Sequence, residues 1–240
     1  MRQFSTLKVD WFKFRKIILD IIFPIRCVGC QKEGRWICER CWVGLKLYNY
    51  SLCPICGLES KNGSVCGYCQ KLTSLDGLSV ILEKNNLSQK LIHFVKYNFV
   101  VDILTVLKPQ FIEYFKINPW WRDFFVLVPV PLHRRRLLER GFNQSQLIAQ
   151  IISEIKGNKI NPKLLQKIKY NHHQVGLSAD KRRSNIIDSF RVSFDLKEDY
   201  HQTIVIVDDV YTTGSTMEEC ARVLKEAGYQ KVWGLVLIRG

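Results

Sequence analysis

The stretch Ile204-Val-Ile-Val-Asp-Asp-Val-Tyr-Thr-Thr-Gly-Ser-Thr216 determines the fold class of this chain. Four consecutive apolar β-branched residues, Ile204 to Val207, are typical of a strand that is buried on both faces, as in a parallel sheet. Asp208 and Asp209 follow at the carboxyl end of that strand, which is the edge where open α/β sheets bind ligands. The sequence therefore predicts a ligand site at residues 208–216.

A helix is predicted directly after the hydroxyl-rich turn. Apolar residues at helical spacing run from Met217 to Ala227, and Gly228 ends the helix. Because the first amides of a helix have no partner within it, they face the preceding turn, where amides, hydroxyls and a glycine suit a phosphate monoester. The two carboxylates suit sugar hydroxyls and Mg2+. The stretch therefore indicates a phosphorylated sugar, with its phosphate held by Thr212, Thr213, Gly214, Ser215 and Thr216.

A more ordinary interpretation of this stretch is a strand that ends in an acidic turn with a hydroxyl N-cap. That interpretation does not account for the two acids and the hydroxyl-rich turn together. Neither the Gly-x4-Gly-Lys-Ser/Thr pattern of a P-loop nor the Gly-x-Gly-x-x-Gly pattern of a dinucleotide fold occurs in the chain.

A similar pattern with the opposite charge occurs earlier in the chain. An apolar strand is predicted from Phe124 to Val130, and a helix from about Gln144 to Ile155. Between them, a basic loop from His133 to Arg140 holds four arginines in eight residues. Planar, permanently charged guanidinium groups suit phosphate oxygens. A solvated surface loop or a nucleic-acid patch is the alternative. The residues predicted to bind pyrophosphate are Arg134, Arg135, Arg136 and Arg140.

The remaining elements complete an α/β pattern. Strands are predicted at 78–82 and 232–238, and helices at 87–97 and 100–115, the second interrupted near Pro109. Alternating strands and helices favour an α/β fold with a mostly parallel sheet flanked by helices. In such a sheet the acidic and basic loops lie on one edge, as expected for a substrate that carries both a sugar phosphate and a pyrophosphate.

Eight of the nine cysteines form four Cys-x2-Cys pairs near the N-terminus. Such a turn places two sulfurs on one side of a knuckle, and two knuckles complete the tetrahedral S4 shell that zinc prefers. We expect sequential pairing with one structural zinc ion in each of two sites, and crossed pairing of alternate knuckles is the alternative. The predicted ligands are Cys27, Cys30, Cys38 and Cys41 in one site and Cys53, Cys56, Cys66 and Cys69 in the other.

Redox dithiols and disulfides are the other chemistries open to paired cysteines. Four equal spacings close together disfavour a redox role, and the rest of the chain, with Cys220 alone, is typical of an enzyme from a reducing compartment. The cysteine segment has few residues with which to build a core, so metal binding is expected to supply much of its folding free energy. Cys220 falls on the apolar stripe of its helix and is expected in the core.

Composition and charge restrict the class of protein. The 240 residues are 47% hydrophobic, which excludes a disordered chain, and the formal net charge of +14 favours anionic substrates or polyanionic partners. Eight thiolates and two Zn2+ ions would together change this charge by −4, to about +10.

Three segments are predicted: an N-terminal amphipathic helix within 1–23, a double zinc ribbon at 24–75 and an α/β domain at 76–240. The run Ile17 to Phe23 contains Asp20 and lacks a small-residue cleavage site, so export is not expected. No apolar run approaches the length of a membrane span. We therefore expect a cytoplasmic protein, and contact of the N-terminal helix with the inner face of the membrane is the alternative.

Further motifs carry a family resemblance. The segments Val128-Pro-Val-Pro-Leu-His-Arg-Arg-Arg136 and Arg140-Gly-Phe-Asn-Gln144 resemble the hallmark of the ComF family, with its ComFC-like and GntX-like members. Lys96-Tyr97 and the run from Gln174 to Asn185 are similar to two more motifs of that family, in the same order. Residues 204–216 resemble the 5-phosphoribosyl-1-pyrophosphate (PRPP) loop of type I phosphoribosyltransferases, although Tyr211 stands where an aliphatic residue is usual.

The resemblance implies a double zinc ribbon joined to a type I phosphoribosyltransferase-like domain that binds PRPP with Mg2+. Asp208 and Asp209 would then be the catalytic residues, in contact with the ribose hydroxyls and hydrated Mg2+. The basic segment and Arg182 would bind the pyrophosphate, and residues 170–185 suit a lid. Residues 78–120 would form the hood that selects the acceptor, which no motif identifies.

Two functions follow from these patterns. The first is a Mg2+-dependent PRPP-binding phosphoribosyltransferase that acts in DNA uptake during natural competence. The alternative is a zinc-dependent accessory protein that binds single-stranded DNA on a catalytically inactive phosphoribosyltransferase fold. Family membership implies single-stranded DNA and other DNA-uptake proteins, such as a helicase, as partners. Aromatic side chains of the zinc module, among them Trp36, Trp42 and Tyr68, would stack on bases or fill the small core.

Overall fold

The computed structural model describes residues 24–97, 100–122, 125–170, 186–193 and 199–240. The helix expected within 1–23, most of the lid expected at 170–185, and Arg182 lie outside these residues. The chain forms two compact units, Met1–Gly44 and Leu45–Gly240, which are described separately. This division falls inside the predicted zinc ribbon and places the second group of cysteines in the same unit as the sheet. The boundaries 24–75 and 76–240 stay a prediction.

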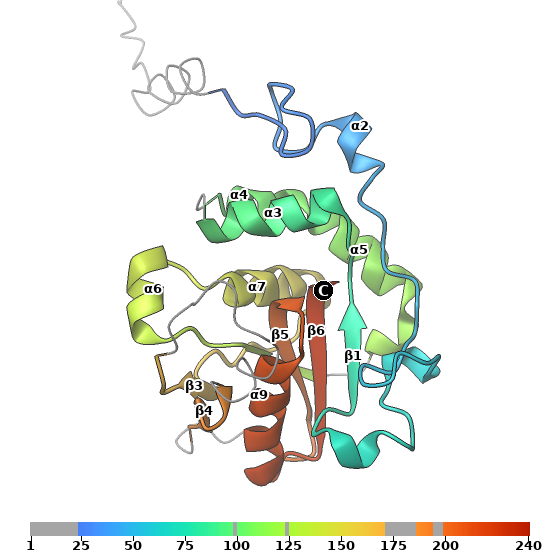
Figure 1. The fold of residues 1–240 in the computed structure, drawn as a ribbon, viewed down its shortest axis with the longest axis vertical. Coiled ribbons are helices and arrows are strands. Elements are labelled where there is room, and N and C mark those ends of the chain that lie inside the picture. The colour runs from blue at the N-terminus through green and yellow to red at the C-terminus, as the bar shows by residue number, and fades with distance from the viewer. Residues whose placement is uncertain (1–23, 98–99, 123–124, 171–185, 194–198) are drawn as a thin grey trace, which may run out of the picture. The chain divides into compact units, whose positions relative to one another are not determined.

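A parallel sheet of four strands forms the centre of the second unit (Figure 1). All three neighbouring pairs are parallel, and the strand order is β1-β6-β5-β2. Residues 159–161 extend the sheet past β2 through a parallel bridge between Leu127 and Ile160. The predicted α/β fold with a parallel sheet is confirmed. The strands are β1 (Gly77–Val80), β2 (Phe125–Pro129), β5 (Thr203–Tyr211) and β6 (Lys231–Arg239).

Strand β5 is longer than the apolar run predicted it to be. It continues through the two aspartates because Val210 and Tyr211 pair with Ile238 and Arg239 of β6. Successive side chains of a strand point to opposite faces of the sheet, so the two aspartates are directed to different sides.

Helices cover both faces of the sheet. Helix α9 (Ser215–Glu226) packs on β5 and β6, and shares one core with Ile204 and Ile206 of β5. Helix α7 (Gln144–Lys156) packs on β2 and β5. On that second face, α3 (Asn86–Tyr97) and α4 (Asp102–Val106) meet α7 around Leu237 and Asp209. Ile204 and Ile206 of β5 therefore face α9, and Asp209 faces α3, α4 and α7.

The helical segment predicted at 100–115 is interrupted as expected. Helix α4 ends at Val106, and α5 (Lys108–Ile117) begins two residues later with Pro109 in its first turn. Proline is tolerated there because the first amides of a helix have no partner within it.

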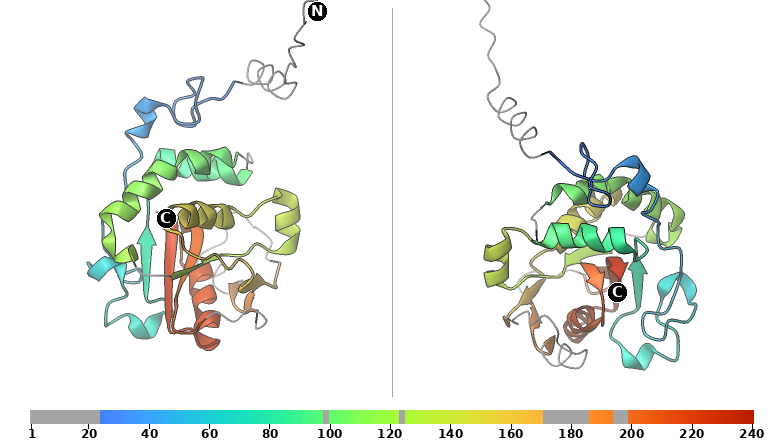
Figure 2. Two further views of the ribbon diagram at one scale, coloured as in Figure 1. Left: turned by 180° about the vertical axis from the view of Figure 1, so that it is seen from behind. Right: turned by 45° about the horizontal axis from the view of Figure 1, so that its top comes forward.

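The basic segment is a helix, and the predicted loop was wrong. Helix α6 (Arg134–Arg140) lies at the margin of this unit, beyond the end of α7 (Figure 2). His133 caps it by accepting a hydrogen bond at Nδ1 from the amide of Arg135, at 3.3 Å. Gly141 ends it at a φ of 75° and donates to the carbonyl of Leu137. Arginine, leucine and glutamate are good helix formers, and this preference outweighs the exposed, charged character that suggested a loop.

A second sheet of two antiparallel strands was not predicted. It pairs β3 (Leu165–Lys167) with β4 (Phe190–Val192). Each strand has only three residues, so even the alternation of Phe190-Arg191-Val192 is too short to identify a strand. The shorter elements are α2 (Glu39–Trp42), η1 (Lys61–Gly63), η2 (Gln70–Leu72) and η3 (Pro119–Arg122).

Candidate ligand site and cysteine clusters

The two aspartates of β5 meet side chains from three other elements at the carboxyl edge of the sheet. Lys96, near the end of α3, places Nζ 2.8 Å from Oδ2 of Asp209. Ser145, in the first turn of α7, donates from Oγ to Oδ1 of Asp208 at 2.9 Å. Arg140 ends α6, and its charge acts on Asp209. The structure therefore brings the acidic segment and the end of the basic segment together, as predicted.

Asp209 lies in the more apolar of the two environments. The residue is 5% exposed, and its carboxylate faces side chains of α3, α4 and α7, among them Leu91, Val95 and Ile148. A carboxylate so placed requires a cation, because its desolvation in an apolar environment is costly. The ammonium group of Lys96 is that cation.

Asp208 has no such cation among the contacts of the described residues. Its Oδ1 accepts hydrogen bonds from Ser145 Oγ and from the amide of Asp209, both at 2.9 Å. Burial, followed by the charge of Asp209, raises the pKa of Asp208 to about 7. Lys96 and the two hydrogen bonds offset part of this rise. A carboxyl group with a strongly raised pKa at a sheet edge is typical of a functional site.

The four predicted arginines separate into two groups. Arg140 donates from Nη1 to Oε1 of Gln144 at 3.1 Å, and its guanidinium lies 5.8 Å from the ring centroid of Tyr97. Burial and the nearby charge of Arg136 lower its pKa, so these two arginines lie close together. Arg134 and Arg135 are exposed on α6, and Arg135 lies over the ring of Tyr170 at 5.3 Å.

Two residues at this site have no signal in the sequence. Ser145 stands next to the Arg140 to Gln144 motif and is an ordinary helix residue by pattern. Lys167 comes from β3, and burial lowers its pKa, while the charge of Asp208 acts in the opposite direction. Its position depends on the unpredicted two-stranded sheet. Lys96 was identified only as part of a family motif, without its partner.

The hydroxyl-rich turn lies beside the aspartates and leads into α9. Gly214 adopts a left-handed conformation with φ of 75° and is the N-cap of the helix. A Cβ atom at this position would collide with the hydroxyl of Tyr211, so both the conformation and the space require glycine. Thr213 Oγ1 and Ser215 Oγ lie 2.8 Å apart. The predicted phosphate-binding residues thus form a compact turn at the start of a 12-residue helix.

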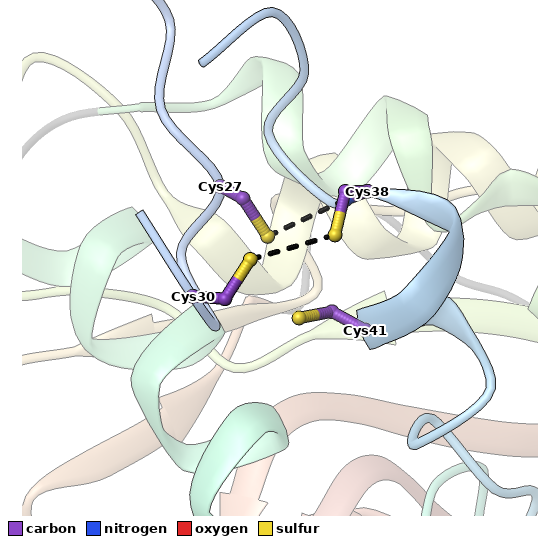
Figure 3. Close-up of side chains that lie close together, drawn as sticks. All are labelled: Cys27, Cys30, Cys38 and Cys41. Atoms are coloured by element: carbon purple, nitrogen blue, oxygen red, sulfur yellow. Dashed lines mark hydrogen bonds between the residues drawn. The ribbon is translucent and has the colours of Figure 1, made fainter. Parts of the chain in front are cut away.

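The eight paired cysteines form two clusters in sequential order. Cys27, Cys30, Cys38 and Cys41 make the first cluster, and Cys53, Cys56, Cys66 and Cys69 the second, each with its sulfurs within 4.8 Å of one another. The predicted sequential pairing is confirmed, and crossed pairing is excluded. In Figure 3 the four side chains of the first cluster point toward a common centre.

The sulfur geometry fits zinc. The Sγ atoms of Cys30 and Cys38 are 3.6 Å apart, and those of Cys56 and Cys66 are 3.7 Å apart. Zn–S bonds of about 2.3 Å in a tetrahedral site place the sulfurs about 3.8 Å from one another. The clusters are therefore two structural zinc sites of the S4 type.

Backbone amides also favour thiolates in these clusters. Burial raises the pKa of Cys27, but hydrogen bonds from the amides of Cys38, Cys30 and Gly29 outweigh it and lower the pKa to about 6. The amide of Cys66 donates to Cys53 Sγ in the same way, at 3.5 Å. Thiolates are the zinc-binding form of cysteine, so the first knuckle of each site is prepared for metal, whereas burial and the neighbouring thiols raise the pKa of Cys41 and Cys69 to about 12.

Comparisons with known proteins match both parts of the chain. Residues 18–70 match the family model described as a double zinc ribbon domain, and residues 140–240 match the model described as a phosphoribosyl transferase domain.

Several related proteins align with this chain over most of their own length and most of its length. "DNA utilization protein YhgH" of Salmonella typhimurium is 31% identical over 225 residues, which are 88% of this chain and 96% of that protein. "Competence protein F" of Haemophilus influenzae is 29% identical over 89% of this chain and 97% of its own length. "Competence protein ComFC" of Bacillus subtilis is 29% identical over 85% of this chain and 83% of its own. Within the described residues, the structure has no helix with the length and apolar character needed to cross a membrane.

Proposed function

Since this chain belongs to the ComF family, in which a double zinc ribbon is joined to a phosphoribosyltransferase domain, we propose that it binds PRPP with Mg2+ at the edge of β5. One observation carries the proposal. Two aspartates, one paired with Lys96 and the other with a raised pKa, lie near the guanidinium of Arg140 and the hydroxyl-rich turn that begins α9. That arrangement offers separate sites for the two ends of a sugar that carries phosphate at both.

Each group of residues has a defined role in this proposal. The turn from Thr212 to Thr216 holds the 5′-phosphate with its hydroxyls and the first amides of α9. Asp208 and Asp209 bind the ribose hydroxyls and hydrated Mg2+, a hard cation that prefers oxygen ligands. Arg140 and Arg136 hold the pyrophosphate, with Arg134, Arg135 and Arg182 as further contacts.

Phosphoribosyl transfer would require little covalent chemistry from these residues. Mg2+ held by Asp208 and Asp209 would supply charge neutralisation for the leaving pyrophosphate, while the chain holds both phosphate groups and orients C1 of the ribose. Arg140 stabilises the charge that develops as the C1–O bond breaks. The raised pKa of Asp208 means that Mg2+ binding competes with a proton near neutral pH.

The test is a calorimetric titration of PRPP in the presence of Mg2+. Asp208→Asn with Asp209→Asn should lower the affinity on the order of 100-fold, because two charge-assisted contacts are lost. Asp102→Asn with Asp199→Asn is the matched control, since it makes the same charge change at two exposed residues. The proposal is wrong if the wild type does not bind PRPP, or if both double variants bind it equally well.

The names of the relatives refer to competence and to DNA utilization. We propose that the protein acts in DNA uptake or utilization, and that single-stranded DNA and other uptake proteins are its partners. The formal charge of +14 supports a polyanionic partner. Tyr68, between Cys66 and Cys69, is 96% exposed, so its ring is available to stack on a base.

Binding to DNA without PRPP is the second candidate function, and Tyr68 is the observation that favours it. Affinity for an oligothymidine should fall steeply between 50 and 200 mM salt, as counterion release requires. Tyr68→Ala should weaken binding by about 1–3 kcal/mol. Tyr50→Ala is the control, since Tyr50 is also an exposed tyrosine but lies outside the knuckles. Weak binding without salt dependence would exclude this function.

A further inference from the structure

The first knuckle of the second zinc site is connected to the phosphate-binding turn. Pro54 lies between Cys53 and Cys56, and its carbonyl oxygen accepts a hydrogen bond from Nη2 of Arg239 at 2.9 Å. The guanidinium of Arg239 also lies over the ring of Tyr211, 5.7 Å from its centroid. The hydroxyl of Tyr211 in turn occupies the space where Gly214 would carry a Cβ. Two side chains therefore span the distance from the zinc knuckle to the turn.

The other knuckle of the same site is connected to the first turn of α9. The amide of Leu72 donates to the carbonyl of Cys69 at 2.9 Å, which fixes the chain as it leaves the knuckle. Thr73 then donates through Oγ1 to the carboxylate of Glu218, and the amide of Ser74 donates to Oε1 of the same residue at 2.7 Å. Glu218 belongs to the first turn of α9.

The zinc site thus holds the turn from both sides, and the segment that makes these contacts depends on metal. Its buried cluster consists of Cys53, Cys69 and Val65. So small a core does not stabilise a fold without metal. Loss of zinc would release Pro54 and Thr73, and with them both contacts that position the turn.

We propose that the second zinc site positions the phosphate-binding turn, with Arg239 and Glu218 as the positioning residues. Zinc at this site and the phosphorylated ligand then strengthen each other's binding, because coupling between two sites is reciprocal. The identity of the ligand rests on the proposed function, whereas the coupling between metal and turn does not. The first zinc site has no part in it.

Amide hydrogen exchange tests the coupling without any ligand. Cys53→Ser with Cys56→Ser should increase exchange at 211–220 at least tenfold, and Cys27→Ser with Cys30→Ser should leave it unchanged. Equal exchange in the two variants would overturn the proposal. If exchange differs but the wild type does not bind PRPP, the proposed function fails and the coupling stands.

Arg239 variants test the same idea with both zinc ions in place. Arg239→Met should lower PRPP affinity about tenfold, while the protein retains two zinc equivalents by mass spectrometry. Arg239→Lys, which keeps a cation and a donor, should restore part of that affinity. Arg191→Met is the control, because Arg191 also donates to a neighbouring oxygen but lies on β4. Equal affinity in the two methionine variants would contradict a positioning role.

Zinc release gives the reciprocal measurement. Saturating PRPP and Mg2+ should slow the release of one of the two zinc equivalents to a zinc-selective chelator about tenfold. The Asp208→Asn, Asp209→Asn variant, which lacks the proposed ligand site, should show no such protection. Equal release rates with and without PRPP in a wild type that binds it would exclude reciprocal coupling.

Discussion

At the scale of single residues, strand alternation gives two neighbouring aspartates different properties. Asp209 faces α3 and is neutralised by Lys96 at 2.8 Å. Asp208 instead accepts hydrogen bonds from Ser145 Oγ and from the amide of Asp209, and it has no ion pair among the described contacts. Burial, followed by the charge of Asp209, raises the pKa of Asp208 to about 7. A pair of this kind is suited to binding both a sugar and a metal ion.

Removal of the Lys96 ammonium group should destabilise the folded protein. Lys96→Met leaves a nearly buried carboxylate without its cation and is expected to lower the free energy of unfolding by about 3 kcal/mol. The measurement is urea denaturation at pH 7.5. Lys108→Met is the control, since Lys108 pairs with Glu154 at the same distance of 2.8 Å but in an exposed position. It should cost less than about 1 kcal/mol.

In the Asp209→Asn background, Lys96→Met should cause little further loss of unfolding free energy, because the buried carboxylate is absent. Equal costs for Lys96→Met and Lys108→Met would show that the buried pair contributes no more than a surface pair.

Asp208 should make stability depend on pH. Its pKa rises from an ordinary 3.8 to about 7 on folding, so the folded protein binds more protons than the unfolded chain between these values. Stability contributed by this group is therefore present at low pH and is lost as pH rises from about 4 to about 7. Asp208→Asn removes that loss. Urea midpoints without Mg2+ should fall more steeply from pH 5 to pH 8 in the wild type than in the variant, and parallel profiles would disprove the shift.

At the scale of elements, the turn before α9 depends on Gly214. Gly214→Ala should lower the free energy of unfolding by about 3 kcal/mol, because it adds a collision with Tyr211 to the strain of a positive φ. PRPP affinity should fall with it. Gly157→Ala is the control, since Gly157 has a similar φ of 72° at the end of α7 but open space around its Cα. It should cost about 1 kcal/mol and leave PRPP affinity unchanged. Similar losses in both variants, measured by urea denaturation and calorimetry, would contradict a special role for the turn.

Elements with strong apolar periodicity were predictable, and elements held by other contacts were not. The strand at 204–207 was identified because burial on both faces leaves a continuous apolar run. The helix after Gly214 was identified because burial of one side leaves an apolar stripe. Helix α6 was missed because its side chains are mostly exposed and leave no apolar stripe. The pair β3 and β4 was missed because each strand is too short to show any period.

At the scale of the whole molecule, the chain forms two compact units that divide at residues 44 and 45, between the two zinc sites. A chain that begins at Leu45 should therefore fold, retain one zinc equivalent and unfold cooperatively. Its thermal midpoint should lie within a few degrees of the main transition of the full protein, and metal analysis should confirm the single zinc ion. Aggregation or the loss of both zinc equivalents would show that the first unit is required for folding.

The sequence by itself determined the parallel sheet and the two sets of zinc ligands, and it led to the ligand site proposed at one edge of the sheet. These follow from local spacing, because apolar periods and Cys-x2-Cys turns act over a few residues. Only the tertiary structure decided that Lys96 pairs with Asp209, that Ser145 binds Asp208, and that Arg239 and Glu218 connect the second zinc site to the turn. These hydrogen bonds and this ion pair join residues that are 63 or more positions apart, for which spacing along the chain carries no information.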